Sequence, residues 1–530
     1  MILIRNLRLD IGQSEEKLKE KAARQLRIPS RAIKNFKITK RSLDARKKND
    51  IHWLYSVAIT ADNENKILSN NKCKDIAIFD EPEYSVPMCH SDMRPVVVGF
   101  GPAGMFAALV LSMAGLSPIV IERGCDALTR KKKVDEFRSG GELDPECNVQ
   151  FGEGGAGTFS DGKLGTGIRD RRIRWILQTF HDHGAPESIL YDAKPHIGTD
   201  ILINVVQNIR RTVINNGGEV RFNSKLTGLV VENNEICAVK VRNQSGEEYE
   251  LGCSELVLAI GHSARDTFEM LERSEIPMEP KPFSMGVRIE HKQTDIDIAQ
   301  YGTEIDSLPA ADYSLNVHLP DGTSAYTFCM CPGGTVVLAS SEEDMVVVNG
   351  MSEYARDGEN ANSAILVGIE PDYFESDNPL SGIDFQRNIE RAAFNFGGKN
   401  YNAPVQLVGD FLKDTPSKKL GTVRPTCTTG TEPGDIRKIL PKCVTDSIAS
   451  AISAFDKKLP GYAMHDAVLT APESRSSSPV RIIRDECRQA SIKGIFPCGE
   501  GAGYAGGIVS AAVDGIRSAE AVLDDELDDC

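Results

Sequence analysis

The chain has 530 residues, 61 Lys and Arg against 76 Asp and Glu, and a formal net charge of −15. Its 41% hydrophobic and 26% charged residues are ordinary for a globular protein, which excludes a disordered chain, a collagen-like chain and a coiled-coil rod. The apolar stretches are too short to span a bilayer, and charged residues interrupt the first of them, so we expect no membrane span, no secretion and a cytoplasmic location.

Residues 1–88 are predicted to form a small βαββ domain. Alternating apolar residues predict a first strand, a helix follows from Ser14, and residues 33–41 and 53–59 predict two more strands. The first 50 residues carry fifteen Lys and Arg against six Asp and Glu, whereas the rest of the chain is acidic. A solvated charged face explains this excess most simply, and the alternative is a docking surface for an electron-transfer partner. Nucleic acid is disfavoured as a partner because the acidic surface repels phosphate.

The strongest motif of the chain begins at residue 95. An apolar strand runs into the glycine turn GFGPAG (residues 99–104), a helix follows, and a second strand ends at Glu122. The glycines permit a tight turn and a close approach of backbone to pyrophosphate, and the helix N-terminus binds the phosphates. A carboxylate at the end of the second strand accepts hydrogen bonds from a ribose. The pattern therefore predicts a dinucleotide-binding domain.

Two further glycine-rich segments indicate which dinucleotide to expect. They are residues 145–168 and residues 494–508, and a strand ending at Gly261 lies between them. In the motifs GFGPAG, FGEGGAGTFSDGKL, TFCMCPGG, SRSSSPVRI and CGEGAGYAGGIVSAA, the chain resembles the FAD-dependent dehydrogenases of largely uncharacterised function, which have the glutathione-reductase type of FAD fold. The resemblance covers nearly the whole chain and implies FAD as the cofactor. The alternative, a Rossmann motif that binds NAD alone, is disfavoured by the C-terminal glycine segment.

The resemblance also implies which residues contact FAD. It assigns the first glycine turn to the pyrophosphate, Glu122 to the adenosine ribose, Leu226 to the adenine, and Glu500 to the ribityl chain. Arg123 is expected beside the ribose or the adenine. Many relatives have Asp where Glu500 stands, so its contact is expected to differ. The last helix is expected to point its N-terminus at the flavin. The complete predicted set is Gly99, Gly101, Pro102, Ala103, Gly104, Glu122, Arg123, Gly154, Gly155, Thr158, Leu164, Leu226, Gly261, Gly499, Glu500, Gly507 and Ile508.

The predicted fold is α/β: a Rossmann-like FAD-binding domain of the glutathione-reductase type, an inserted α+β substrate domain and the N-terminal βαββ domain. The predicted boundaries are 1–88 for the N-terminal domain, 93–280 and 470–530 for the two parts of the FAD-binding domain, and 281–469 for the insertion. No second GxGxxG motif appears, so NADH or NADPH is expected only as a transient electron donor.

The thirteen cysteines follow no short repeating frame, which predicts reduced thiols rather than a disulfide scaffold. The chain contains no CxxC pair, and we predict no metal site. The closest pair is Cys329 and Cys331, which share one face of a predicted strand. They are either a redox pair near the flavin or, as we favour from the sequence, small buried residues at a strand end.

We expect an FAD-dependent oxidoreductase that moves a hydride between the flavin and an unidentified small organic substrate. The candidate catalytic residues are Arg475 as a binder of a substrate carboxylate, His291 as a proton donor and Tyr504 as a ring near the flavin. For Arg475 and His291 a structural role is the simpler interpretation. The alternative function is a flavin-containing binding or redox-sensing protein whose N-terminal domain engages a partner.

Overall fold

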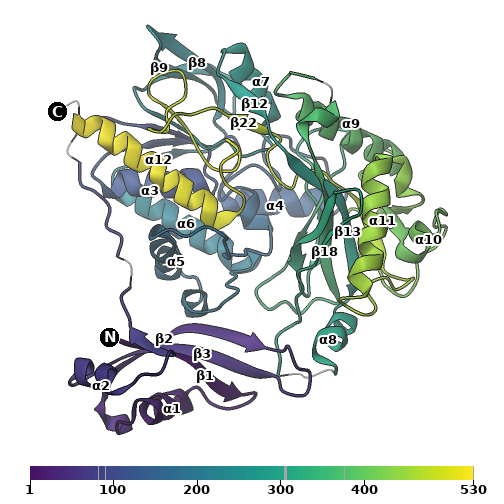
Figure 1. Cartoon of the computed structure of the whole chain (residues 1–530). Helices are drawn as coiled ribbons and strands as arrows, with labels where there is room; N and C mark the ends of the chain where they lie inside the picture. Colours follow the sequence, from purple (N-terminus) through teal and green to yellow (C-terminus); the bar gives the residue numbers. More distant parts are fainter. Residues whose placement is uncertain (82, 90, 304–306, 375, 529–530) are drawn as a thin grey trace.

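The computed structural model describes the chain except residues 82, 90, 304–306, 375 and 529–530, and the side chains of residues 525–528 also lie outside the described part. Figure 1 shows three parts: an N-terminal module, an α/β domain, and a domain built around a large sheet. Among the described residues, no helix combines the length and the apolar character that crossing a membrane requires.

The N-terminal module is a four-stranded antiparallel sheet with two helices. Its elements are β1 (Ile2–Asp10), α1 (Glu16–Leu26), a 3₁₀ turn (Ser30–Ala32), β2 (Ile33–Asp44), β3 (His52–Ala61), α2 (Glu64–Asn70) and β4 (Ile76–Ile78), in the sheet order β2-β3-β1-β4. The predicted strands and helix are confirmed, with α2 and β4 as additions. β2 is longer than predicted because Ser42 and Leu43 continue the ladder opposite Leu54 and Trp53, so the connecting turn shortens.

The α/β domain contains a five-stranded parallel sheet in the order β23-β11-β5-β6-β7. A three-stranded antiparallel sheet, β10-β9-β8, lies in the same domain. The elements are β5 (Val96–Val98), α3 (Pro102–Met113), β6 (Ile119–Ile121), α4 (Ala127–Arg138), a 3₁₀ turn (Ala156–Phe159), α5 (Arg172–Asp182), a 3₁₀ turn (Glu187–Leu190), α6 (Thr199–Asn215), β7 (Glu219–Arg221), β8 (Lys225–Glu232), β9 (Glu235–Arg242), β10 (Glu248–Gly252), β11 (Leu256–Leu258), α7 (Arg265–Arg273), β23 (Ile495–Pro497) and α12 (Ile508–Asp528).

The α/β domain has three layers, because alternate side chains of the parallel strands pack on opposite faces of the sheet. Successive side chains of a strand point to opposite faces of the sheet. Val97 packs in the apolar cluster that includes α3, α6 and α12, whereas Val96 and Val98 pack in the cluster that includes β8, β9 and α7. The parallel sheet therefore lies between a layer of helices and the antiparallel sheet. The central strands β11, β5 and β6 are continuous apolar runs because both of their faces are buried, whereas the edge strand β7 (EVR) is only half-buried.

The third part is formed around a seven-stranded mixed sheet in the order β14-β15-β18-β13-β21-β19-β20. Its elements are β13 (Phe283–Lys292), α8 (Gln293–Tyr301), β14 (Asn316–His318), β15 (Ser324–Cys331), β16 (Thr335–Leu338), β17 (Val348–Met351), β18 (Asn360–Ile369), a 3₁₀ turn (Pro371–Phe374), α9 (Ser381–Phe396), β19 (Ala403–Leu407), α10 (Val408–Leu412), β20 (Thr431–Pro433), a 3₁₀ turn (Ile436–Lys438), α11 (Lys442–Asp456) and β21 (Val468–Glu473). Figure 1 shows α11 against β13 and β18.

The chain passes between the α/β domain and the inserted domain through two adjacent strands. β12 (Met278–Pro280) enters the insertion and β22 (Val480–Ile482) leaves it, and the two pair antiparallel. β21 pairs with β13 and β19 inside the sheet of the insertion. β21 (Val468–Glu473) therefore crosses the predicted boundary at residue 469, and the insertion continues to the end of this strand.

Candidate active site

The glycine turn between β5 and α3 is shaped by backbone contacts that exclude side chains. Gly99 has φ +93°, and a Cβ at this position would lie 2.3 Å from the carbonyl oxygen of Ala259. A Cβ on Gly104 would lie 1.9 Å from the carbonyl oxygen of Gly99. Pro102 opens α3, and no side chain caps the helix N-terminus. The first N–H groups of α3 are therefore left to bind an anion beside the turn.

Glu122 holds three segments of the site together. Its buried carboxylate accepts hydrogen bonds from the backbone N–H groups of Phe100 (2.8 Å), Gly124 (2.9 Å) and Gly152 (2.9 Å). These donors belong to the glycine turn, the end of β6 and the glycine-rich loop. A carboxylate has about four acceptor positions, so it retains capacity for a ligand hydroxyl. The adjacent Arg123 pairs with Glu146 and Asp266 and lies 4.0 Å from the centre of the Phe151 ring.

Arg130 organises the glycine-rich loop, and sequence reasoning missed it. Its fully buried guanidinium donates to the carbonyl oxygens of Asn148, Val149 and Glu153 at 2.8 Å and of Gly155 at 2.9 Å. These bonds satisfy carbonyls of a loop that has no regular secondary structure to pair them. Arg130 is the second residue of a run of polar and basic side chains, TRKKK (residues 129–133), and nothing in that run distinguishes it.

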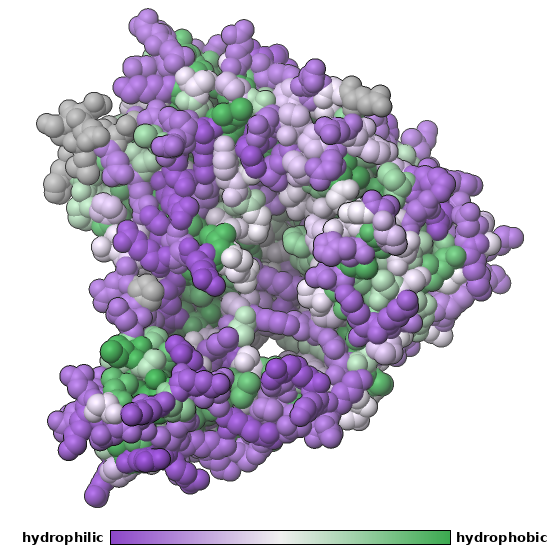
Figure 2. Space-filling view, viewed as in Figure 1, coloured by the Kyte–Doolittle hydropathy of each residue, from purple (hydrophilic) through white to green (hydrophobic). Residues whose placement is uncertain are grey.

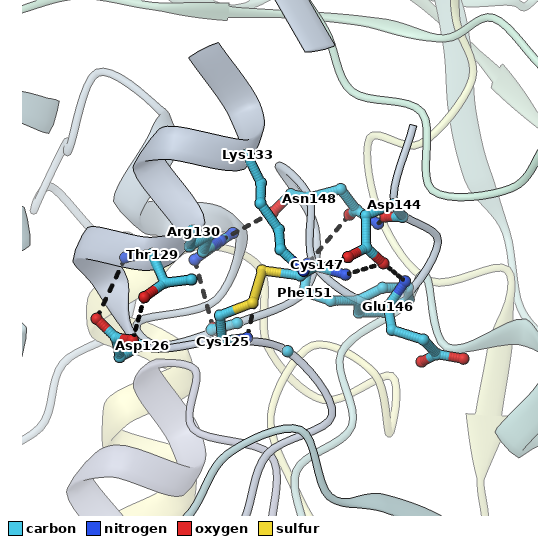
Figure 3. Close-up of a disulfide and its surroundings, with 12 residues drawn as sticks. Cys125, Asp126, Thr129, Arg130, Lys133, Asp144, Glu146, Cys147, Asn148 and Phe151 are labelled. Atoms are coloured by element: carbon cyan, nitrogen blue, oxygen red, sulfur yellow. Dashed lines mark hydrogen bonds and ion pairs between the residues drawn. A yellow bond between two sulfur atoms is a disulfide. The ribbon is translucent and has the colours of Figure 1, made fainter. Parts of the chain in front are cut away.

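A disulfide joins the end of β6 to the same loop. Cys125 and Cys147 are bonded, with Cα atoms 5.8 Å apart and 22 positions apart in sequence. Figure 3 shows the bond beside the guanidinium of Arg130 and the first turn of α4. The prediction that all thiols are reduced is therefore wrong for this pair. The pairing has no recognisable spacing, and only the approach of the loop to β6 brings the two residues together.

A cavity of about 360 Å³ lies where these segments meet. Residues from both ends of the α/β domain contribute to its wall, and so do residues of the inserted domain. Of the predicted cofactor set, the wall includes Gly99, Gly101, Pro102, Ala103, Glu122, Arg123, Gly155, Leu226, Gly261, Glu500, Gly507 and Ile508.

Five predicted cofactor residues lie behind the wall instead. A Cβ on Gly154 would meet Oγ1 of the buried Thr158 at 1.9 Å, so these two residues shape the loop from inside. Leu164 is buried in the apolar cluster of the helices. Gly499 donates its N–H to Asp514, and Gly104 packs α3 on β5. Each acts on the cavity through a neighbour rather than by direct contact.

Glu500 and His262 form a titratable pair at the C-terminal side of the cavity. Their Oε1 and Nε2 atoms are 3.9 Å apart. Burial raises the pKa of Glu500 to about 7. Burial, with help from the charge of Arg475, lowers the pKa of His262 to about 3. The imidazole is therefore neutral at physiological pH, and the carboxyl group is poised to hold or release a proton.

Arg475 reaches the cavity wall, but its guanidinium is committed elsewhere. Nε and Nη2 bind the buried carboxylate of Glu390 at 2.9 and 2.6 Å, and Nη1 donates to Ser341 and Ser263. Glu390 also pairs with Arg265 of the α/β domain. The expectation that Arg475 binds a substrate carboxylate is therefore corrected. Its guanidinium belongs to an internal network that joins the two domains.

His291 and Tyr504 do not reach the cavity, and both expectations of a catalytic role are corrected. His291 is fully buried within β13, where its Nε2 lies 2.9 Å from the carbonyl oxygen of Tyr462. Tyr504 is 37% exposed, and the guanidinium of Arg484 lies 3.7 Å from the centre of its ring. The sequence alone does not show that His291 is buried in β13 or that Tyr504 points outward.

The inserted domain supplies the remaining wall of the cavity. The contributing residues are Phe328, Cys329, Asn349, Glu473, Arg475 and Ser476. Most of these side chains are polar. Lys163 of the glycine-rich loop lines the same cavity and contacts the carbonyl of Met330. The cavity therefore joins the glycine turn at one side to a polar wall at the other.

Comparison with known proteins finds two matching families and a full-length relative. Residues 282–476 match the family described as FAD-dependent protein, C-terminal domain-like, and residues 1–60 match a domain of unknown function. An uncharacterized protein of Clostridium beijerinckii is 47% identical over 530 residues, which cover 99% of this chain and 98% of that protein.

Solved structures are more distant. A flavin-dependent brominase aligns with 82% of this chain and 80% of its own at 13% identity, with a TM-score of 0.38. Glycine oxidase from Bacillus cereus aligns with 82% of this chain and 96% of its own at 11% identity, with a TM-score of 0.35. At these TM-scores neither structure constrains the fold or the reaction of this chain.

Proposed function

Because the chain belongs to the FAD-dependent dehydrogenase family of largely uncharacterised function, it is an FAD-dependent oxidoreductase, and we propose that it moves a hydride between the flavin and a small organic substrate. We also propose that its FAD-binding domain is of the glutathione-reductase type. The three layers of helices, parallel sheet and antiparallel sheet support this assignment.

The residues of the cavity fit FAD. Gly99 and Gly101 line the cavity beside the N-terminus of α3, where a pyrophosphate would fit, and a Cβ on Gly99 would collide with the carbonyl oxygen of Ala259 and disturb the turn. Glu122 retains acceptor capacity for the adenosine ribose. At the other end, Gly507 and Ile508 place the N-terminus of α12 at the wall, where its partial positive charge favours a reduced, anionic ring. When bound, FAD supplies the hydride chemistry that no side chain provides.

The observation that carries the proposal is one continuous cavity with walls from two domains. The α/β domain contributes the nucleotide side, and the inserted domain contributes Cys329, Asn349 and Glu473. A protein that held FAD only as a structural or sensing group would be expected to fill the space against the ring with apolar side chains. The polar character of this wall favours an enzyme over that alternative.

The chain's own residues supply binding, orientation and a proton site. The bonds of Arg130 and Glu122 preorganise the loop and the turn before any ligand arrives. Glu500 lies at the wall with a pKa raised to about 7 by burial, so it can hold a proton near neutral pH. We propose that Glu500 acts in this way beside the flavin, with His262 as its neutral neighbour.

The first test is an anaerobic absorbance spectrum of the purified full chain, followed on addition of NADH, NADPH or dithionite. Bands near roughly 370 and 450 nm that bleach with a pyridine nucleotide are expected for a reductase with a transient nucleotide donor. Bleaching by dithionite alone would favour an organic substrate as the donor. A colourless protein that takes up no added FAD would overturn the proposal, and the ligand released on denaturation distinguishes FAD from other flavins.

Docking of an electron-transfer partner on the basic N-terminal module stays a proposal. Lys37, Arg41 and Arg46 are already paired with carboxylates, and Arg41 joins the module to the α/β domain through Asp192. Figure 2 shows the hydrophilic surface of the module and an opening between it and the main body. Lys47 and Lys48 remain exposed in the turn between β2 and β3.

Charge reversal at that turn tests the docking proposal. Lys47→Glu with Lys48→Glu is expected to slow electron transfer to an acidic protein carrier, most strongly at low salt. Transfer to a small uncharged acceptor should not change. Equal rates with the protein carrier at every ionic strength would count against docking at this surface.

A further inference from the structure

Two cysteines stand at an irregular end of β15, next to the cavity. β15 pairs with β18 through Phe328 and Ala364, and the next pair is Cys331 with Asn362, so β15 carries one extra residue. This residue forms a β-bulge, a device that redirects side chains and is common beside active sites. Cys329 lies in the bulge with φ +42°, in the left-handed region that residues other than glycine rarely adopt. Such strain persists only where the surroundings enforce it.

The bulge gives the two cysteines different exposures but keeps them in contact. Cys329 lines the cavity and is partly exposed, whereas Cys331 is fully buried. The thiol of Cys331 donates to the carbonyl oxygen of Cys329 at 3.1 Å, and the guanidinium of Arg288 lies 3.9 Å from the sulfur of Cys331. In a regular strand, alternate residues share a face but are held apart by the extended backbone. The left-handed conformation of Cys329 departs from this extended geometry, and the sulfur of Cys331 approaches the backbone of Cys329.

The charged groups around the pair are arranged asymmetrically. Lys163 approaches from the glycine-rich loop and Arg288 from β13, and Arg288 donates to the carbonyl oxygen of Cys329 at 3.0 Å. Carboxylates face these cations: Glu473 binds Arg288 at 2.6 Å, and Asp161 lies 3.8 Å from Lys163.

This arrangement separates the acidities of the two thiols. The neighbouring Cys331 thiol, with the cations Lys163 and Arg288, lowers the pKa of Cys329 to about 5. The neighbouring Cys329 and burial raise the pKa of Cys331. A partly exposed thiolate beside a protonated, buried partner is the usual arrangement of a reactive dithiol.

We propose that Cys329 and Cys331 are a redox-active pair that exchanges two electrons with the flavin in this cavity. The inference rests on the proposed function, because it requires FAD at this site. The disulfide between the two sulfurs accepts an electron pair from the reduced anionic flavin, the S–S bond breaks, and the proton from flavin N5 is transferred to one sulfur. The products are oxidised FAD, one thiolate and one thiol, so charge, protons and electrons balance. Cys329 holds the thiolate beside Lys163, and Cys331 holds the proton.

The experiment counts electrons and maps thiols in the FAD-loaded full chain. Anaerobic titration with dithionite is expected to consume two more electrons per FAD in the wild type than in Cys329→Ser or Cys331→Ser. Cys487→Ser, an exposed cysteine in a separate loop, is the matched control and should behave as the wild type. The disulfide between Cys125 and Cys147 is common to all of these proteins, so it cancels in the difference.

Alkylation and mass spectrometry give a readout that does not depend on the variants. In the oxidised wild type the peptide with Cys329 and Cys331 should resist alkylation, and after reduction both sulfurs should be labelled. If the flavin bleaches but both sulfurs are alkylated in the oxidised protein, the redox pair is wrong and the flavin function stands. If the protein takes up no FAD, the proposed function fails together with the inference. If a serine variant loses FAD, alkylation of Cys329 and Cys331 in the oxidised and reduced wild type still shows whether the two sulfurs form a redox pair.

Discussion

Replacement of Arg130 by methionine tests whether the glycine-rich loop is held by one buried guanidinium. The change removes donors to four carbonyl oxygens at 2.8 to 2.9 Å, those of Asn148, Val149, Glu153 and Gly155. Methionine keeps much of the apolar packing and removes a buried cation, which offsets part of the loss. Each buried carbonyl oxygen left without a donor costs about 1–3 kcal/mol, and the net loss is smaller than the sum because methionine no longer buries a cation. We expect a loss of about 3–5 kcal/mol for Arg130→Met.

The assay combines urea unfolding with retention of FAD. If ordering the loop costs about 3 kcal/mol more in Arg130→Met, FAD binding weakens roughly a hundredfold. Arg130→Lys should lose less, because an ammonium group reaches some of the same carbonyls. Lys132→Met is the control, since Lys132 is exposed on the same helix. An Arg130→Met protein with an unchanged unfolding midpoint and full FAD content would refute the role assigned to this residue.

Three further predictions concern the turn, the proton site and the domain contact. Gly104→Ala is expected to abolish FAD retention on gel filtration, because its Cβ would lie 1.9 Å from the carbonyl oxygen of Gly99, whereas Gly368→Ala has open space and should stay yellow. A yellow Gly104→Ala protein would contradict this packing. Burial raises the pKa of Glu500 from 4.5 to about 7. Between these pH values the folded chain keeps a proton that the unfolded chain releases. The free energy of unfolding of the wild type therefore falls as the pH rises from 4.5 to about 7. Glu500→Gln removes this pH dependence of stability, so the Tm of the variant relative to that of the wild type should rise from pH 5 to pH 8. If Tm changes equally with pH in both proteins, the assignment is refuted. Arg41→Ala breaks a two-bond contact with Asp192, so protease should cleave faster between the N-terminal module and the α/β domain while the FAD spectrum is retained, with Lys40→Ala as the control. Unchanged cleavage would show that the module is held by other contacts.

Residues whose conformation follows from their neighbours in sequence were predictable. The turn at residues 99–104 needs glycine because its backbone packs against itself and against Ala259, and the strand, helix and strand around it appear in the chain as patterns of apolar residues. The buried face of α1 follows in the same way from its helical spacing. The glycine-rich segments were recognisable as ligand-binding loops for the same local reason.

Roles that depend on a distant partner were not predictable. Arg475 has the chemistry of a carboxylate binder, but Glu390, 85 positions away, occupies its guanidinium. Tyr504 lies within a glycine turn, but it faces Arg484 instead of the cavity. His291 was a reasonable proton donor until the packing of β13 placed it in the core. Each of these side chains could perform the predicted chemistry, but its neighbours in the fold keep it from the cavity or bind its functional group.

The amino-acid sequence by itself determined that this protein has a nucleotide-binding α/β domain, because glycine turns, apolar strands and a terminal carboxylate are local patterns with one structural meaning. Only the tertiary structure brought the two ends of that domain and the polar wall of the insertion to one cavity. It also placed Arg130 under the loop, joined Cys125 to Cys147, and turned Cys329 toward the cavity through a bulge. The physical reason is that exposure, partners and charge at these residues are set by segments far away in the sequence, whose approach is decided by the packing of whole layers.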